Sequence, residues 1–346
     1  MNSAMALVCR VGADVATRSW RWQPVDRRPL GHDELRVKVL VASVNPIDVK
    51  RAAGYGQRVL SLMGAGGREL VLGNDFAGVV AEVGRDVRHA SVGDRVWGLV
   101  PTGAQGTHRS EVCVSARWVR PLPEAVLMVS AAALPYTFTT LWRALAAVGL
   151  HEGNAAGRQV LVNGAGGALG QLAIQLLSRW GAWVTAVCGS ASHTRCLALG
   201  AHQVIDRHAT ALSGLPSNCD VTLNFGAWSD DADVIGRLHR SALGHATTVH
   251  PLLGEIDARG WVAGGLTCWR AWRAMRSHLH SIAPKARYAW TVFKPDEGAM
   301  DAIQASFASR PLVLDVAHRA PFTHAESAFA HVGQGHPTRA VLMAEI

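Results

Sequence analysis

A glycine-rich turn joins an apolar run to a segment of helical period, and this order of elements constrains the fold. Residues 159–163 read Gln-Val-Leu-Val-Asn, residues 164–170 read Gly-Ala-Gly-Gly-Ala-Leu-Gly, and residues 171–177 continue with helical period. This order predicts a strand that leads into a helix whose N-terminus faces a ligand. Glycine is needed where a side chain would hold the backbone away from a diphosphate. The turn therefore predicts a dinucleotide site built from Gly164, Ala165, Gly166, Gly167, Ala168, Leu169 and Gly170.

The residues after this helix narrow the choice of dinucleotide. A second apolar strand is predicted at 183–188, and in such units a carboxylate about 20 residues past the glycines holds the adenosine ribose of NAD. Residues 189–195 read Gly-Ser-Ala-Ser-His-Thr-Arg and contain no acid. Hydroxyls and a cation favour the 2′-phosphate of NADPH, with Ser190, Ser192 and Arg195 as its contacts. In the alternative interpretation, a serine caps the next helix and Arg195 is solvated.

Length and composition are typical of a soluble protein with two domains. The 346 residues can form two cores, and 49% of them are hydrophobic while 17% are charged. Residues 1–9 lack a long apolar region with a basic flank, and no apolar run approaches about 18 residues. We therefore expect a cytoplasmic protein without a membrane span. The six cysteines show no paired spacing, so neither disulfides nor a zinc cluster is expected.

The formal charge of +8 raises the question of nucleic acid as a partner. The basic residues are spread along the chain, so nucleic acid is not expected. The densest basic patch is Trp-Arg-Ala-Trp-Arg-Ala-Met-Arg at 269–276. Such a patch could contact RNA or a membrane surface, but the favoured interpretation is an amphipathic helix that packs Trp269, Trp272 and Met275 inward.

The order of predicted elements indicates an α/β protein. Residues 1–128 contain short alternating runs broken by Gly and Pro, which predict a barrel-like β domain. From residue 159 onward, strands and helices alternate in the βαβ pattern of a doubly wound parallel sheet. The C-terminal residues return to a strand and complete the first domain. The predicted domains are 1–128 with 295–346, and 129–294.

Several segments resemble the medium-chain dehydrogenase/reductase superfamily, in its zinc-free quinone oxidoreductase branch. The resemblance lies in Ser-Val-Asn-Pro-Ile-Asp-Val-Lys at 43–50, Leu-Gly-Asn-Asp-Phe-Ala-Gly at 72–78, Gln-Gly-Thr at 105–107, Leu-Pro-Tyr at 134–136 and the glycine turn. The chain is most similar to the mitochondrial reticulon-interacting oxidoreductase subgroup. This resemblance implies a Rossmann-type domain with a GroES-like domain, NADPH-dependent reduction of a quinone or α,β-unsaturated carbonyl, and a homodimer.

The zinc ligands of the superfamily are missing from this chain. Zinc-dependent members carry a cysteine before the Asp48 position and a histidine-glutamate pair after the Gly73 position. This chain has Asn45 and Asn74-Asp75 there, and it lacks the four-cysteine lobe, so no metal is expected. The reaction must then rely on hydrogen-bond donors to stabilise charge on the substrate oxygen.

The resemblance also implies roles for individual residues. Asn45 is placed to hold the nicotinamide ribose, Tyr55 to donate to the substrate oxygen, and Thr140 to contact the nicotinamide. In the alternative interpretation, each residue has only a structural role. Asn45 precedes a proline in a turn, and Tyr55 lies in a turn between two glycines. Thr140 forms a hydrogen bond within its own helix. Asp48 and Asp75 are expected to fix loops.

Residues 224–228 depart from the family pattern. The family carries an aspartate and a glycine pair near the nicotinamide ribose, whereas this chain reads Asn-Phe-Gly-Ala-Trp. Asn224, Phe225 and Phe293 are the remaining candidate cofactor contacts. Two other functions stay open: a reductase of enoyl thioesters or natural-product intermediates, and an NADPH-binding sensor or interaction protein with little catalysis.

Overall fold

The chain forms two compact units in a computed structural model that describes residues 3–12, 18–103 and 106–345. The first unit comprises Met1–Thr139 and Lys294–Ile346, and the second comprises Thr140–Phe293. The division falls inside helix α4 (Pro135–Val148), whereas the sequence prediction placed it at 128/129. Gln105, part of the Gln-Gly-Thr segment, lies outside the described residues.

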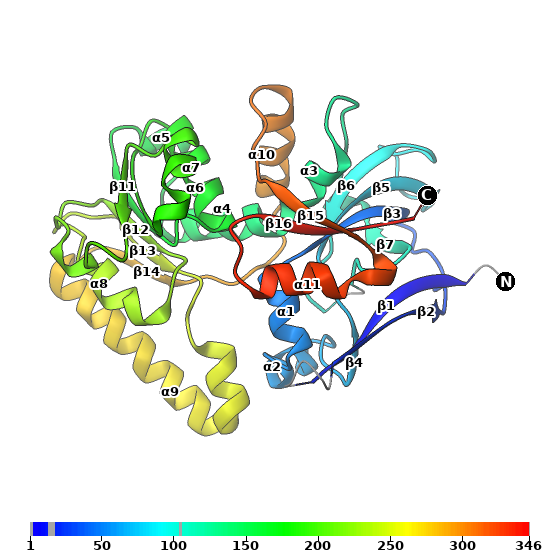
Figure 1. Cartoon of the computed structure of the whole chain (residues 1–346), viewed down its shortest axis with the longest axis horizontal. Coiled ribbons are helices and arrows are strands. Elements are labelled where there is room, and N and C mark those ends of the chain that lie inside the picture. The colour runs from blue at the N-terminus through cyan, green and yellow to red at the C-terminus, as the bar shows by residue number, and fades with distance from the viewer. Residues whose placement is uncertain (1–2, 13–17, 104–105, 346) are drawn as a thin grey trace. The chain divides into compact units, whose positions relative to one another are not determined.

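The second unit is built on a six-stranded parallel sheet, with strand order β11-β10-β9-β12-β13-β14 (Figure 1). The strand order reverses between β9 and β12, and ligands of doubly wound folds bind at such a switch point. The glycine turn follows β9, so it lies at this point. The strands are β9 (Gln159–Asn163), β10 (Trp183–Cys188), β11 (Gln203–Asp206), β12 (Val221–Asn224), β13 (Gly244–Thr247) and β14 (Arg287–Trp290).

Helices of the second unit pack along this sheet. Helix α6 contacts β9 and β10 through buried apolar side chains, because its apolar residues recur with helical period. These elements confirm the predicted α/β class. The helices are α5 (Glu152–Ala155), α6 (Ala168–Arg179), α7 (His193–Ala198), α8 (Asp231–Ile235) and α9 (Leu252–Ile282).

Helix α9 is interrupted at Gly260, whose φ of 76° is outside the helical range. After the break, residues 261–282 form one continuous helical segment. The prediction that Trp269 packs inward is wrong, since 51% of this residue is exposed, whereas Trp272 and Met275 are half-buried. Within the described residues, no helix has the length and apolar character needed to cross a membrane.

The first unit contains two mostly antiparallel sheets around a shared apolar core. The larger sheet has the order β15-β16-β3-β5-β6-β8, with β7 also paired to β3. Strand β16 pairs with β3, which brings the C-terminal residues into this unit. The strands are β1 (Ala4–Arg10), β2 (Ser19–Val25), β3 (Glu34–Val44), β4 (Glu69–Val71), β5 (Asp75–Val83), β6 (Arg95–Leu99), β7 (Glu111–Ser115), β8 (Val119–Pro121), β15 (Val316–Pro321) and β16 (Arg339–Met343).

Short helices complete the first unit. Helix α1 begins after Asn45, and Pro46 suits the first helical position because its missing N–H needs no partner there. Helix α11 packs on β16. The helices are α1 (Pro46–Ala52), α2 (Gln57–Leu62), α3 (Met128–Ala132), α10 (Glu297–Ala308) and α11 (Glu326–Gly333).

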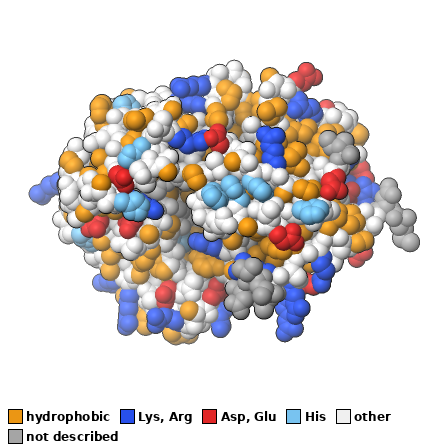
Figure 2. Space-filling model, viewed as in Figure 1, with side chains coloured by type: hydrophobic (Ala, Val, Ile, Leu, Met, Phe, Trp, Pro, Cys, Tyr) orange, Lys and Arg blue, Asp and Glu red, His pale blue; other side chains and the backbone are white. Residues whose placement is uncertain are grey.

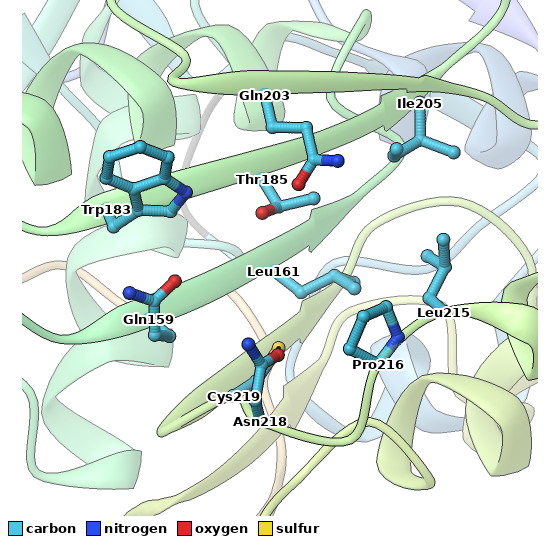
Figure 3. A pocket seen from close by; sticks show the side chains of 10 residues that line it. All are labelled: Gln159, Leu161, Trp183, Thr185, Gln203, Ile205, Leu215, Pro216, Asn218 and Cys219. Carbon is cyan, nitrogen blue, oxygen red and sulfur yellow. The ribbon is translucent and has the colours of Figure 1, made fainter.

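One face of the parallel sheet carries a depression of about 330 Å³ (Figure 3). The crossover from β11 to β12 contains only a 3₁₀ turn at Leu212–Gly214, so no long helix covers this area. Alternate residues of each strand point to one face, and they form the floor of the depression. The lining residues are Gln159, Leu161, Trp183, Thr185, Gln203, Ile205, Leu215, Pro216, Asn218 and Cys219.

Candidate active site

Two glycines of the turn are required by close contacts between backbone segments. Gly164 has a φ of 79°, and a Cβ there would lie 2.7 Å from the backbone of Phe225 and Gly226. A Cβ on Gly170 would lie 2.4 Å from the Cα of Ala165. Both contacts involve backbone, which has little freedom to shift. Gly164 and Gly170 therefore hold strand, turn and helix α6 together.

The other half of the turn is open. A Cβ on Gly167 would meet only the Gly164 carbonyl oxygen, at 3.5 Å, and Gly167 is exposed. In the described part of the chain, the backbone amides of Gly166, Ala168 and Leu169 have no hydrogen-bond partner. The first amides of a helix carry partial positive charge and bind anions readily. The turn thus fits a diphosphate group.

Arg195 is held beside this turn by Gln171. The Arg195 Nε atom donates to Gln171 Oε1 at 2.8 Å, and Gln171 Nε2 donates to the Gly166 carbonyl oxygen at 2.7 Å. Ser192 lies against Gly166, because its Oγ atom would be 2.6 Å from a Cβ there. Ser190 is exposed in the same loop. Hydroxyl and guanidinium groups therefore gather next to the open amides.

Gln171 was not predicted as part of the site. Its side chain is fully buried in a helix whose other buried residues are mostly apolar. A buried polar side chain needs a hydrogen-bond partner. A glutamine within an apolar helical stretch was therefore the available sequence signal, but it does not identify the partner.

The loop after β12 is shaped by Asn224. This buried side chain donates to the Ala227 carbonyl oxygen and to Asp231 Oδ1, both at 2.9 Å, and it accepts from Asn163 Nδ2 at 3.0 Å. Phe225 runs beside Gly164 through its backbone. Phe293 is half-buried at the end of the second unit. The amide group of Asn224 is therefore engaged within the protein itself.

Asp231 is the centre of a buried cluster of hydrogen-bonded side chains next to the loop after β12. Burial raises the pKa of Asp231, but hydrogen bonds from His245, Asn224 and Tyr288 hold that pKa below its ordinary value. The His245 Nε2 atom lies 3.0 Å from one carboxylate oxygen, and the Tyr288 hydroxyl donates to the other at 3.1 Å. A charged Asp231 thus links side chains of β12, β13 and β14.

In the first unit, Asn45 belongs to a buried network. Its Nδ2 atom donates to Ser43 Oγ and to Asp75 Oδ2, both at 3.1 Å, and its Oδ1 atom accepts from Arg339 Nη2 at 2.5 Å. Asp75 also accepts from Ser43 Oγ at 2.7 Å and from the Tyr136 amide at 2.7 Å. Every polar group of the Asn45 side chain therefore has a partner inside this unit.

Two carboxylates share this interior with the guanidinium of Arg339. Asp48 accepts from the backbone amides of Asn45 at 2.8 Å and Gly73 at 3.0 Å, which fixes both loops. Burial raises the pKa of Asp75 to about 7, although hydrogen bonds from Ser43 and Asn45 and the charge of Arg339 lower it. Burial also lowers the pKa of Arg339, whereas Asp75 and Asp48 raise it.

The remaining predicted residues occupy different surroundings. Tyr55 is half-buried between Gly54 and Gly56, which have φ values of 91° and 80°, and its ring lies 5.5 Å from Lys50 Nζ. Thr140 is buried in α4, at the start of the second unit. The structure thus brings the glycine turn together with Ser192, Arg195 and the Phe225 loop, and it places Asn45 and Tyr55 in the first unit.

The described residues contain no group of three or more His, Cys, Asp or Glu side chains that could hold a metal. The six cysteines are buried and unpaired by disulfides, and burial raises the pKa of Cys9 to about 12. Buried thiols of this kind pack as small apolar groups.

The two units and the glycine turn define a class: oxidoreductases that bind a nicotinamide dinucleotide on a doubly wound sheet. Residues 31–124 match the alcohol dehydrogenase GroES-like domain. The chain is 34% identical over 318 residues to the mouse protein "NAD(P)H oxidoreductase RTN4IP1, mitochondrial", covering 88% of this chain and 80% of that one. The chain belongs to the zinc-free quinone oxidoreductase branch of the medium-chain dehydrogenase/reductase superfamily.

Two further proteins resemble this chain, one in its fold and one in part of its sequence. A solved quinone oxidoreductase from Coxiella burnetii shares the fold with a TM-score of 0.81 at 20% identity, covering 99% of this chain and 100% of that one. A mycocerosic acid synthase-like polyketide synthase of Mycobacterium tuberculosis is 35% identical over 189 residues, which is 55% of this chain and 8% of that one.

The prediction of a cytoplasmic location is wrong. The relatives from mouse, cattle, human and zebrafish, which are 30–34% identical over 88% of this chain, are all named as mitochondrial. The sequence prediction relied on the composition of residues 1–9, and that composition does not identify a compartment.

Proposed function

We propose that this oxidoreductase uses NADPH to reduce a quinone or an α,β-unsaturated carbonyl without a metal. The observation that carries the proposal is the cradle of Gly166, Ala168 and Leu169 amides next to Ser192 and Arg195. Family membership supports the use of a nicotinamide cofactor.

NADPH is favoured over NADH by the loop after β10. Residues 189–195 contain no carboxylate that would repel a 2′-phosphate. Ser190 and Ser192 would supply hydroxyl donors, and Arg195, oriented by Gln171, would supply a cation. The backbone amides of the turn would hold the diphosphate.

The first unit would supply the hydrogen-bond donor to the substrate oxygen. When bound, the nicotinamide group supplies a hydride. The Tyr55 hydroxyl would donate to the substrate oxygen, where negative charge develops as the acceptor is reduced. Asn45 would act through positioning, since Arg339, Ser43 and Asp75 engage its side chain and fix the start of α1.

The function is tested by following NADPH absorbance with three acceptors: a short-chain quinone, a simple enone and an enoyl thioester. We expect oxidation of NADPH with the quinone or the enone, and much slower oxidation of NADH. A protein that binds neither nicotinamide cofactor at millimolar concentration would overturn the proposal. Turnover with the thioester alone would select the second candidate, an enoyl-thioester reductase, which the polyketide synthase relative favours.

Replacing Tyr55 with phenylalanine tests the proposed donor. We expect turnover to fall by about 10²-fold, because one hydrogen bond to a developing oxyanion has this effect. NADPH affinity and the thermal unfolding midpoint should stay unchanged, since only the hydroxyl is removed. A decrease of less than about threefold would assign Tyr55 a structural role.

A further inference from the structure

The segment of α9 after Gly260 carries a stripe that the described part of the chain leaves exposed. Val262, Leu266, Trp269, Arg273 and Arg276 follow one another at spacings of four and three residues, so they share one face of the helix. Val262 is 87% exposed, Leu266 44% and Trp269 51%. The buried residues of this segment, Gly264, Cys268 and Leu279, lie on the other side. We call the five-residue set the α9 stripe.

The sequence around the α9 stripe is rich in basic residues. Residues 258–295 contain no Asp or Glu and seven cations, at Arg259, Arg270, Arg273, Arg276, Lys285, Arg287 and Lys294. Among the described residues, no carboxylate forms an ion pair with Arg270, Arg273 or Arg276. Figure 2 shows basic and hydrophobic side chains, with some acidic ones among them, along the lower left edge of the view.

Aromatic side chains lie among these cations. The Arg273 guanidinium is 5.3 Å from the centre of the Trp269 ring, and the Arg276 guanidinium is 5.2 Å from that of Trp272. Both guanidinium groups thus lie against aromatic rings and not against carboxylates. Their positive charge can therefore attract an external anion. A helix that combines exposed Trp, Leu and Val with arginines has the character of helices that lie in a membrane interface.

We propose that the α9 stripe docks this protein on an anionic lipid surface. The apolar residues of the stripe would enter the boundary between headgroups and acyl chains. Arg273 and Arg276 of the stripe, together with the neighbouring Arg270, would pair with lipid phosphates. RNA would use the arginines but would gain nothing from an exposed valine and leucine. A second copy of the chain, bound through the same face, would bring Arg270, Arg273 and Arg276 against the same three arginines. The proposal is independent of the reductase activity.

Vesicle co-sedimentation of the full chain tests this proposal. Vesicles of phosphatidylcholine with about a third of phosphatidylglycerol should bind the protein, and pure phosphatidylcholine vesicles should bind it weakly. The variant R270E/R273E/R276E should partition about 10²-fold more weakly, because each cation contributes about a factor of five. Leu266→Ser with Trp269→Ser should also weaken binding, and this loss should persist at high salt.

A matched control variant distinguishes the effect of the stripe on vesicle binding from the effect of net charge. The variant R68E/R240E/R319E changes three exposed arginines elsewhere and has the same net charge as the first variant. It should keep most of the vesicle binding. Equal losses in both triple variants, or no preference for anionic vesicles, would overturn the proposal. So would binding of an RNA homopolymer, or self-association measured by light scattering, that depends on the stripe while vesicles stay unbound.

Discussion

Replacing Arg339 with leucine is expected to lower the free energy of unfolding by about 3–5 kcal/mol. The guanidinium is buried and donates to Asn45 Oδ1 at 2.5 Å, within the interior that holds Asp48 and Asp75. Removing it leaves the Asn45 amide oxygen without this donor and takes one guanidinium away from the two buried carboxyl groups, although Arg51 remains close to Asp48. Urea denaturation measures the loss, and Arg319→Leu is the matched control, since Arg319 is exposed. The control should change stability by no more than about 0.5 kcal/mol.

The loss should also depend on pH. Burial raises the pKa of Asp75 to about 7 in the folded protein, and the charge of Arg339 lowers that pKa. A carboxyl group whose pKa is higher in the folded than in the unfolded protein lowers stability when it ionises. This loss of stability builds up as the pH rises from the unfolded pKa to the folded pKa. Without Arg339 the pKa of Asp75 rises further, so the deficit should be larger at about pH 8 than at about pH 5. A deficit below about 1 kcal/mol at both values would contradict the buried network.

Replacing Gly167 with valine should reduce NADPH affinity by about 10²-fold or more, which corresponds to about 3 kcal/mol. The φ of Gly167 is −78°, and a Cβ would meet only one atom, at 3.5 Å, so the fold has room for the side chain. The branched side chain would then stand beside the amides of Gly166, Ala168 and Leu169, where the diphosphate is expected. Titration calorimetry measures the affinity, and the thermal unfolding midpoint should be unchanged.

Two other glycines are controls for this variant. Gly214→Val should alter neither affinity nor stability, because a Cβ there has no neighbour within 4 Å. Gly170→Val should destabilise the fold, because its Cβ would clash with the Ala165 backbone. A folded Gly167→Val protein with unchanged NADPH affinity would contradict the assignment of the turn.

The parts of the fold that depend on short-range pattern could be predicted from the sequence. The strand at 159–163, the glycine turn and the strand at 183–188 appear where apolar runs and helical period place them, because neighbouring residues determine these elements. The network around Asn45 could not be predicted in the same way. Its guanidinium comes from Arg339, 294 residues away, and only the pairing of β16 with β3 brings it there.

The orientation of side chains also could not be predicted from the sequence. The period of residues 269–276 predicts an amphipathic helix but does not determine which aromatic residues pack inward, and Trp269 is exposed. Arg195 was predicted from its residue type, whereas Gln171, which orients it, has no motif. Side-chain hydrogen bonds between separate elements depend on packing, which period does not specify.

The position of the diphosphate in a crystal of the NADPH complex is the most direct test of this description. We expect its oxygens to accept from the amides of Gly166, Ala168 and Leu169, and the 2′-phosphate to contact Ser190, Ser192 or Arg195. A diphosphate bound away from the turn at 164–170, or a 2′-phosphate that contacts none of these three side chains, would contradict it.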